Sequence, residues 1–587
     1  MRKRSRAFAL LTCALLCAAR AGTAPGQQTA PTPADSEALQ LEAGKPFERE
    51  LKTGETHVYK VTLEAGQFLD AAVNQRGVDV VVRVYAPDGS RLAEVDSPNG
   101  TQGDEPVALE AKTAGTYRVE VSPLAQGAGA RAGRYEIRVE EILSAEAHAR
   151  RLAEERRRRQ AVVASLRESV IPVRTVEAGS GFEDLQPLKR VFRDVRFVAL
   201  GEATHGTREF FQFKHRMLEF LVREMGFRVF AIEASYAACQ NINDYVSGRA
   251  DDGAAALDSQ GFWTWNTEEV RAMLDWMRAY NKAAPPERRV KFVGFDIQVN
   301  DTGKAKLLEY LKRVAPERAA ATEAFFKTSL EDLSAAVFRK GGQATDELAK
   351  LRELRDEYDE LFVFLELNGA RLAAKSGPEE YEQMREYARV LAQYTDSYSS
   401  ASGGGVARDL YMADNLRRIA EREPPGTRFV LWAHNAHVAT TDHGGDYPTM
   451  GFYLRRFYGD SYYALGFSFN RGSFQAREAQ PKDASKRMLM SFTVPPAPAD
   501  SVEWYMAQAG PKMFVLDYRA RRGAAGLGEW LAAPRPMRAV GSMYGPGLEQ
   551  ASFGHVNLGT DFDGLFFIDA GTHARPNPSV PNVAREQ

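Results

Sequence analysis

Short apolar runs alternate with amphipathic helical patterns from Ile171 onward, and this alternation restricts the fold more than any other feature. The apolar runs are Arg196–Leu200, Phe227–Glu233, Val290–Asp296, Phe429–Ala433 and Tyr462–Phe469. Helical patterns over Arg208–Met225, Ser235–Val246 and Glu268–Lys282 lie between them. Strands that alternate with helices favour a mainly parallel sheet covered on both faces. We therefore expect an α/β fold with flanking helices.

Two further segments extend this expected domain, which we place at residues 171–570. Leu307 to about Ser400 is almost entirely helical in character and rich in Glu, Lys, Arg, Ala and Leu. It predicts a helical insertion in a position to cover a site. The late runs Met513–Tyr518 and Leu565–Asp569 predict strands at the edge of the sheet.

The pattern before this domain is different. Between residues 41 and 142, short alternating runs are broken by turn sequences such as Pro87-Asp88-Gly89. This spacing predicts an all-β sandwich domain. Residues 143–170 follow as a charged linker helix, and we interpret its run Arg156–Arg159 as a solvated face. The net charge of −2 provides no global basic field for nucleic acid, so we expect no nucleic-acid partner.

The N-terminus has the pattern of an export signal. A basic segment, Met1–Arg6, precedes the apolar stretch Ala7–Ala19, which is too short to span a membrane. We predict a signal peptide over 1–21, disordered segments at 22–40 and 571–587, and a periplasmic or extracellular protein. No later run approaches a membrane span. The mature chain would keep only Cys239, so it could form no internal disulfide.

Polar residues follow the predicted strands where they end. Glu202 and His205 follow the first, Glu233 and Asp296 end the next two, and His434 and His437 follow the fourth. In an open parallel sheet the carboxyl ends of the strands lie along one edge, where ligands bind. We therefore expect a shared site there. A carboxylate and an imidazole that converge on one water are suited to general-base chemistry.

The N-terminal domain resembles the bacterial pre-peptidase C-terminal family. The matching segments include Val84–Gly89, Ala114–Tyr117 and Gly133–Tyr135. This resemblance implies an accessory module for binding or secretion and does not imply catalysis.

The longer domain resembles the erythromycin esterase family over about Ile171 to Asp569. The motifs that carry the resemblance are Gly201–Gly206, Lys214–Arg216, Ile232-Glu233, Gly294–Asp296, Arg408–Asn415 and Trp432–His437. The resemblance implies hydrolysis of an ester or macrolactone, with a possible part in macrolide resistance, a small-molecule substrate and no cofactor. No Gly-x-Ser-x-Gly nucleophile elbow occurs in the chain, in agreement with direct attack by water.

The resemblance also implies roles for individual residues. His205 would be the general base, oriented by Glu202 and Glu233. His434 would assist the water or the leaving alkoxide, and Arg408 would stabilise the oxyanion. The residues assigned to substrate binding are Lys214, Trp263, Trp265, Asp296 and His437. Packing, helix capping and ordinary ion pairing are the simpler explanations for several of these, including Glu233, Arg408 and the two tryptophans.

Two other functions remain open at this level. His434, His437 and His443, with Asp442 and Asp446, make a stretch suited to zinc or manganese, so a metal-dependent hydrolase or protease is an alternative. A non-catalytic envelope-binding protein is the other. We assign no metal ligand, because the closer resemblance implies metal-independent hydrolysis. The sequence predicts neither the substrate nor the oligomeric state.

Overall fold

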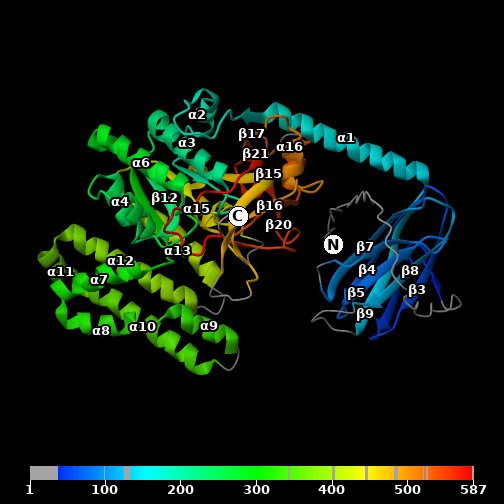
Figure 1. The fold of residues 1–587 in the computed structure, drawn as a ribbon, viewed down its shortest axis with the longest axis horizontal. Coiled ribbons are helices and arrows are strands. Elements are labelled where there is room, and N and C mark those ends of the chain that lie inside the picture. The colour runs from blue at the N-terminus through cyan, green and yellow to red at the C-terminus, as the bar shows by residue number, and fades with distance from the viewer. Residues whose placement is uncertain are drawn as a thin grey trace. The chain divides into compact units, whose positions relative to one another are not determined.

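The computed structural model describes residues 38–584 apart from 98–99, 125–131, 341–343, 400–403, 443–446, 482–486, 520 and 524–525 (Figure 1). The chain forms two compact units that divide between Ala161 and Val162, within helix α1 (Ala145–Ser169). The predicted signal peptide and nearly all of the predicted leader lie outside the described residues, as do His443 and Asp446. Within the described ranges, no helix combines the length and apolarity needed to cross a bilayer.

The first unit is a β-sandwich, as the sequence predicts. A five-stranded sheet has the order β1-β3-β8-β5-β6, and a four-stranded sheet has the order β2-β9-β4-β7. The strands are β1 (Leu39–Gln40), β2 (Phe47–Leu51), β3 (His57–Leu63), β4 (Phe68–Arg76), β5 (Val80–Tyr85), β6 (Arg91–Val95), β7 (Gln102–Glu110), β8 (Gly115–Pro123) and β9 (Gly133–Leu143). Alternate residues of these strands, such as Tyr59, Val61 and Leu63, form its apolar core.

The second unit is built on a ten-stranded sheet whose main path is β10-β17-β21-β15-β11-β14-β12-β13. Strands β13, β12, β14, β11, β15 and β21 run parallel, whereas β17 and β16 pair antiparallel. The strands of this sheet are β10 (Val170–Pro172), β11 (Phe197–Leu200), β12 (Val229–Ser235), β13 (Lys291–Asp296), β14 (Phe429–Trp432), β15 (Tyr462–Glu478), β16 (Leu489–Val494), β17 (Met513–Asp517), β19 (Met543–Tyr544) and β21 (Gly564–Gly571). Strands β18 (Arg535–Arg538) and β20 (Phe553–Val556) form a separate two-stranded sheet. The expected mainly parallel α/β fold is confirmed.

Helices cover both faces of this sheet. Because successive side chains of a strand point to opposite faces, the buried strands present an apolar surface on each side. Val198 and Leu200 of β11 share an apolar cluster with α3, α4, α5 and α6. Phe197 and Ala199 of the same strand share the other cluster with α13, α15, α16 and α17. The helices are α2 (Leu188–Val191), α3 (Arg208–Met225), α4 (Cys239–Val246), α5 (Gly253–Asp258), α6 (Glu268–Ala283), α13 (Gly404–Arg422), α14 (Asn435–Val438), α15 (Met450–Tyr458), α16 (Val502–Ala507), α17 (Leu527–Ala532) and α18 (Leu558–Asp561).

The predicted helical insertion is present (Figure 1). It has an apolar core of its own. It comprises α7 (Asp301–Val314), α8 (Pro316–Phe326), α9 (Leu330–Lys340), α10 (Thr345–Leu367), α11 (Gly369–Ser376) and α12 (Pro378–Ser399). Leu361 and Leu365 of α10 and Leu391 of α12 are buried in this core. The insertion connects β13 to α13, so it enters the sheet unit beside the edge strand.

The C-terminal segment differs from the disordered tail that the sequence predicts. Residues 571–584 are described, and part of this segment lies against the starts of α3 and α6. Arg208 N donates to Thr572 O, and Glu268 N donates to Arg575 O, each at 2.8 Å. Backbone groups at helix N-termini have no partner within the helix. The segment supplies them, which explains why a polar sequence without helical or strand periodicity is ordered here.

Candidate active site

Neighbouring parallel strands bring the predicted site residues to one edge of the sheet. Leu200 of β11 is in register with Trp432 of β14, and Trp432 is in register with Ile232 of β12. Glu202, Glu233 and His434 each follow these positions by one or two residues. Residues from distant parts of the chain therefore converge, because their strands end side by side.

Glu202 is the centre of one half of the site. Its Oε1 lies 2.7 Å from Nδ1 of His205. Its Oε2 accepts hydrogen bonds from Nζ of Lys214 at 2.5 Å and from Nε1 of Trp432 at 2.7 Å. Lys214 comes from the second turn of α3, and its Nζ lies 4.2 Å from the centre of the Trp432 ring. This half therefore contains a buried ion pair enclosed by an aromatic side chain.

Burial and charge act against each other in this pair. Burial acts to raise the pKa of Glu202, but Lys214 and His205 outweigh it and hold that pKa below its ordinary value. Burial lowers the pKa of Lys214 to about 8, although the Glu202 carboxylate opposes the shift. Glu202 is therefore an anion at neutral pH and can accept a hydrogen bond from the Nδ1–H group of His205.

His205 is held with one ring nitrogen available. Its Nδ1 is engaged with Glu202, so a neutral ring places its lone pair on Nε2. Nε2 has no hydrogen-bond partner among the residues that the structure describes. The ring packs edge-on against Trp265 at 5.7 Å and lies 5.0 Å from the ring of His434. These contacts fix a basic nitrogen at the edge of the sheet.

Arg408 organises the other half of the site. Its Nη2 donates to Oε1 of Glu233 at 2.8 Å and to Oδ2 of Asp296 at 2.7 Å, and its Nε donates to Oδ1 of Asp296 at 3.0 Å. The remaining nitrogen, Nη1, lies 3.1 Å from Nε2 of His437. Burial acts to raise the pKa of Glu233, but His437 and Arg408 hold it well below its usual range.

The two histidines that follow β14 have opposite environments. His434 Nδ1 accepts from Ala436 N at 3.2 Å, and its Nε2 lies 3.2 Å from the carbonyl oxygen of Val540. Burial lowers the pKa of His434 to about 4. His437 Nδ1 instead lies 2.9 Å from Asp409, and Glu233 and Asp409 overcome burial to raise the pKa of His437 to about 10.

The side chains of the site differ in how much of their surface is exposed to solvent. The side chains of Glu202, Lys214 and Asp296 are 0% exposed. Those of His205, Arg408 and His437 retain 13%, 18% and 16%. Lys214 and Asp296, assigned to substrate binding from the sequence, are therefore fully buried and contact Glu202 and Arg408, respectively.

The two tryptophans also occupy different positions. Trp265 is buried, packs against Trp432 at 5.1 Å, and donates from Nε1 to the backbone oxygen of Glu233 at 2.9 Å. It supports the site from within the core. Trp263 is half-buried, with the guanidinium carbon of Arg477 5.9 Å from its ring centre. Of the pair, Trp263 is the one that is accessible to a ligand.

Two supporting residues were missed in the sequence, although both lie within the motifs noted there. Trp432 shares a hydrogen bond with Glu202, and Asp409 shares one with His437. The only signal available was position: Trp432 precedes His434 by two residues, and Asp409 follows Arg408 on the same helix.

In the described part of the chain, no group of three His, Cys, Asp or Glu side chains is placed to hold a metal ion. His434 and His437, two members of the proposed metal-binding stretch, have the separate partners described above. Asp442 is described but belongs to no such group.

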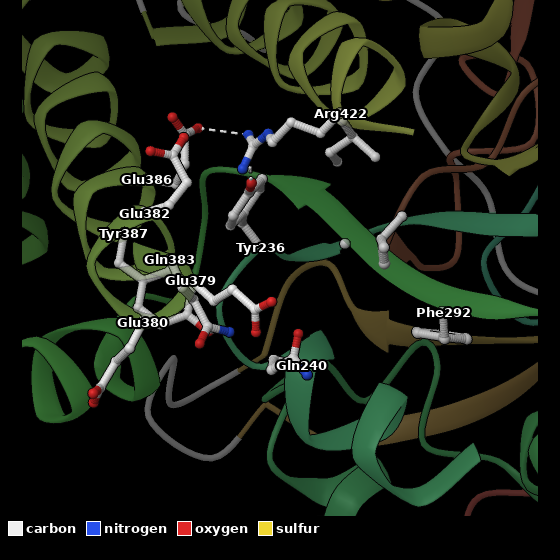
Figure 2. A pocket seen from close by; sticks show the side chains of 13 residues that line it. Tyr236, Gln240, Phe292, Glu379, Glu380, Glu382, Gln383, Glu386, Tyr387 and Arg422 are labelled. Atoms are coloured by element: carbon white, nitrogen blue, oxygen red, sulfur yellow. Dashed lines mark hydrogen bonds and ion pairs between the residues drawn. The ribbon is translucent and has the colours of Figure 1, made fainter. Parts of the chain in front are cut away.

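A separate cavity of about 550 Å³ lies away from this chemistry (Figure 2). Residues of β13, α12 and α13 line it, among them Phe292, Glu379, Glu386 and Arg422. Figure 2 shows Arg422 directed toward Glu386, and their ion pair measures 2.9 Å. None of the polar residues that follow β11, β12, β13 and β14 at the candidate site lines this cavity.

Comparisons with known proteins agree with this architecture. The family profile described as Erythromycin esterase matches residues 222–571, and the one described as Bacterial pre-peptidase C-terminal domain matches residues 55–123. Erythromycin esterase type II of Escherichia coli is 28% identical over 335 residues, covering 52% of this chain and 77% of that protein. The Bacillus subtilis (strain 168) protein YbfO is 24% identical over 383 residues, covering 60% of this chain and 80% of that protein.

A solved structure shares the fold. A Bacillus cereus protein superposes with a TM-score of 0.61 at 23% identity, covering 71% of this chain and 99% of that chain. The first family profile includes Glu233, Asp296, Arg408, His434 and His437 but begins after Glu202, His205 and Lys214.

Lys214→Met should strongly destabilise the protein and reduce any activity that depends on His205. Removing one partner of a buried ion pair costs about 3–5 kcal/mol, because the other charge remains buried without compensation. Glu202 should then bind a proton more readily. Chemical denaturation measures the change, with Lys189→Met as the matched control. Lys189 pairs with Glu224 on the surface, where such pairs contribute about 0–1 kcal/mol. Equal losses in the two variants would contradict this account.

His434→Asn should weaken the dependence of the free energy of unfolding on pH between pH 6.5 and about 4. Between pH 6.5 and about 4 the unfolded chain binds a proton at His434 and the folded chain does not, so stability falls as pH falls. The slope from one such group is about 1.4 kcal/mol per pH unit. Asn can still accept a hydrogen bond at the start of α14.

Thermal melts from pH 7 to pH 4 measure this slope. His215 also has its pKa lowered to about 4 by burial, and it remains in the variant. The slope should therefore decrease without vanishing, and an unchanged slope would show that His434 is not buried in its neutral form.

Proposed function

The chain belongs to the erythromycin esterase family, and we propose that it hydrolyses an ester or lactone by direct attack of a water molecule activated by His205. The observation that carries this proposal is the hydrogen-bonded chain Lys214–Glu202–His205, which leaves Nε2 of His205 available. A neutral imidazole with a carboxylate on its other nitrogen is well suited to general-base catalysis near neutral pH.

The charge balance of the site favours the proton transfer. Glu202, Glu233, Asp296 and Asp409 outnumber the cations Lys214, Arg408 and protonated His437. When His205 takes the proton of the attacking water, its positive charge compensates this excess. Glu202, at 2.7 Å, stabilises the imidazolium as it forms. The hydroxide adds to the carbonyl carbon, and the oxyanion collapses with expulsion of the alkoxide.

Arg408 has a narrower role than the sequence predicts. Its Nε and Nη2 are occupied by Asp296 and Glu233. Only Nη1 has an N–H group to direct toward an oxyanion. We propose that Arg408 supplies this one donor and otherwise holds the two carboxylates in place.

A covalent acyl-enzyme does not form part of the proposal. Cys239 is buried, and its burial raises the pKa of the thiol well above its ordinary value, so it is not a thiolate at neutral pH. The family supports a small-molecule substrate, and macrolide lactones are the first compounds to test because two relatives of this chain are named erythromycin esterases.

His205→Ala should abolish water addition that the wild-type protein performs on macrolides or simpler esters. Loss of a general base costs about 10²–10⁴-fold in rate. Mass spectrometry detects the gain of one water, and a reaction in ¹⁸O-labelled water should place the label in the product carboxylate. The exposed His555→Ala is the control.

An unchanged rate in His205→Ala would rule out the proposed base. A parallel assay with EDTA separates this mechanism from the metal-dependent alternative, which predicts loss of activity on chelation.

We also propose export of the chain, on the strength of the basic and apolar segments Met1–Arg6 and Ala7–Ala19. Expression in a Gram-negative host should yield a periplasmic or secreted protein that begins at Gly22. N-terminal sequencing of each cell fraction measures this, and an uncleaved protein confined to the cytoplasm would contradict it.

A further inference from the structure

Asp409 is a buried carboxylate next to the proposed site, and it has no role in the proposed mechanism beyond its charge. Its side chain is 1% exposed, on the first half of α13. Oδ1 lies 2.9 Å from Nδ1 of His437 and also accepts a hydrogen bond from Met450 N at 2.7 Å. Met450 is the first residue of α15. Asp409 therefore joins α13, α14 and the start of α15.

The Asp409 contact determines where His437 carries its protons. Nδ1 donates to Asp409, so Nε2 is directed to the opposite side of the ring. There it lies 3.2 Å from Oε1 of Glu233 and 3.1 Å from Nη1 of Arg408. A protonated Nε2 donates to Glu233, and a deprotonated Nε2 accepts from Arg408. His437 therefore has a hydrogen-bond partner both before and after it loses a proton.

We infer that Asp409 is a positioning residue that holds His437 as the proton donor to the leaving alkoxide. This inference rests on the proposed function. His205 and His437 then have separate tasks: His205 Nε2 takes a proton from water, and His437 Nε2 gives one to the departing oxygen. His434 cannot share the second task, because both of its ring nitrogens face backbone groups.

The proton balance of the reaction is complete. Water loses one proton to His205 Nε2, and its oxygen forms the new bond to the acyl carbon. The bond between that carbon and the leaving oxygen breaks, and His437 Nε2 transfers its proton to that oxygen. The products are an acid and an alcohol. His205 then releases a proton to solvent and His437 regains one.

The groups around His437 favour the protonated ring before the reaction. Asp409 and Arg408 face it from α13, Glu233 from β12 and His434 from the N-cap of its own helix α14, while Asp296 of β13 is reached through Arg408. Three of these groups are carboxylates and Arg408 is the only permanent cation. The raised pKa of His437 agrees with this arrangement.

Leaving-group dependence tests the inference. An alkyl ester needs a proton on its departing oxygen, whereas a p-nitrophenyl ester does not. Asp409→Asn should therefore lose about 10²-fold in kcat on an alkyl ester, with little change in KM, and stay within a few-fold of wild type on the aryl ester. Asn keeps an acceptor for Met450 N. Asp414→Asn is the matched control, since Asp414 lies on the same helix and pairs with Arg417, Arg418 and the buried Arg389.

A second measurement does not depend on any substrate. NMR titration of ¹³Cε1-labelled histidine in the full chain follows the ring of His437, whose signal is assigned by its loss in His437→Gln. Asp409→Asn should lower the titration midpoint of His437 by at least one pH unit, and Asp414→Asn should not.

Each result has a distinct meaning. An unchanged midpoint in Asp409→Asn, or equal defects on the aryl and alkyl esters, would overturn the inference. Should Asp409→Asn fail to fold, His437→Gln must show the same preference for the aryl ester. Hydrolysis that survives His205→Ala would instead refute the proposed function, and it would leave the titration result unaffected.

Discussion

The charge of Glu202 is the constraint on which the candidate site depends. A carboxylate with no exposure is costly unless it is paired and hydrogen-bonded. Lys214, Trp432 and His205 supply three donors, and each comes from a different part of the chain: α3, β14 and the turn after β11. The register of β11 with β14 and the path of α3 must both be correct for this carboxylate to remain charged. Fold and chemistry are therefore coupled through one side chain.

The sequence was sufficient to predict the convergence of the strand ends, because strand order and direction decide it. Glu202, Glu233 and His434 follow adjacent strands, and short apolar runs between helical patterns are enough to place them. How deeply each side chain is buried could not be predicted in the same way. Lys214 and Asp296 resemble substrate ligands in the sequence, and only the packing of α3 and the bidentate contact of Arg408 with Asp296 show that they are fully buried.

Other features were hidden because they depend on partners without a local pattern. Residues 572–577 have neither strand nor helix periodicity, and their order comes from hydrogen bonds with α3, α6 and the segment before α6. Asp409 looks like one more acid on an amphipathic helix, since α13 also carries Asp414 in ordinary ion pairs. Its contact with Met450 N of α15, at the same oxygen that faces His437, has no local signal in the sequence.

The partner of Nδ1 gives each of the three histidines a different character. In His205 that partner is Glu202, whose charge Lys214 partly balances. Nε2 of His205 has no hydrogen-bond partner among the residues that the structure describes. In His437 it is Asp409, and Glu233 lies at the other nitrogen, so two carboxylates favour a cation. In His434 it is the backbone N–H of Ala436, which requires an unprotonated Nδ1 and keeps the buried ring neutral. One residue type can thus supply the proposed base, the proposed acid and a neutral ring at the same sheet edge, because Nδ1 of each ring has a different partner.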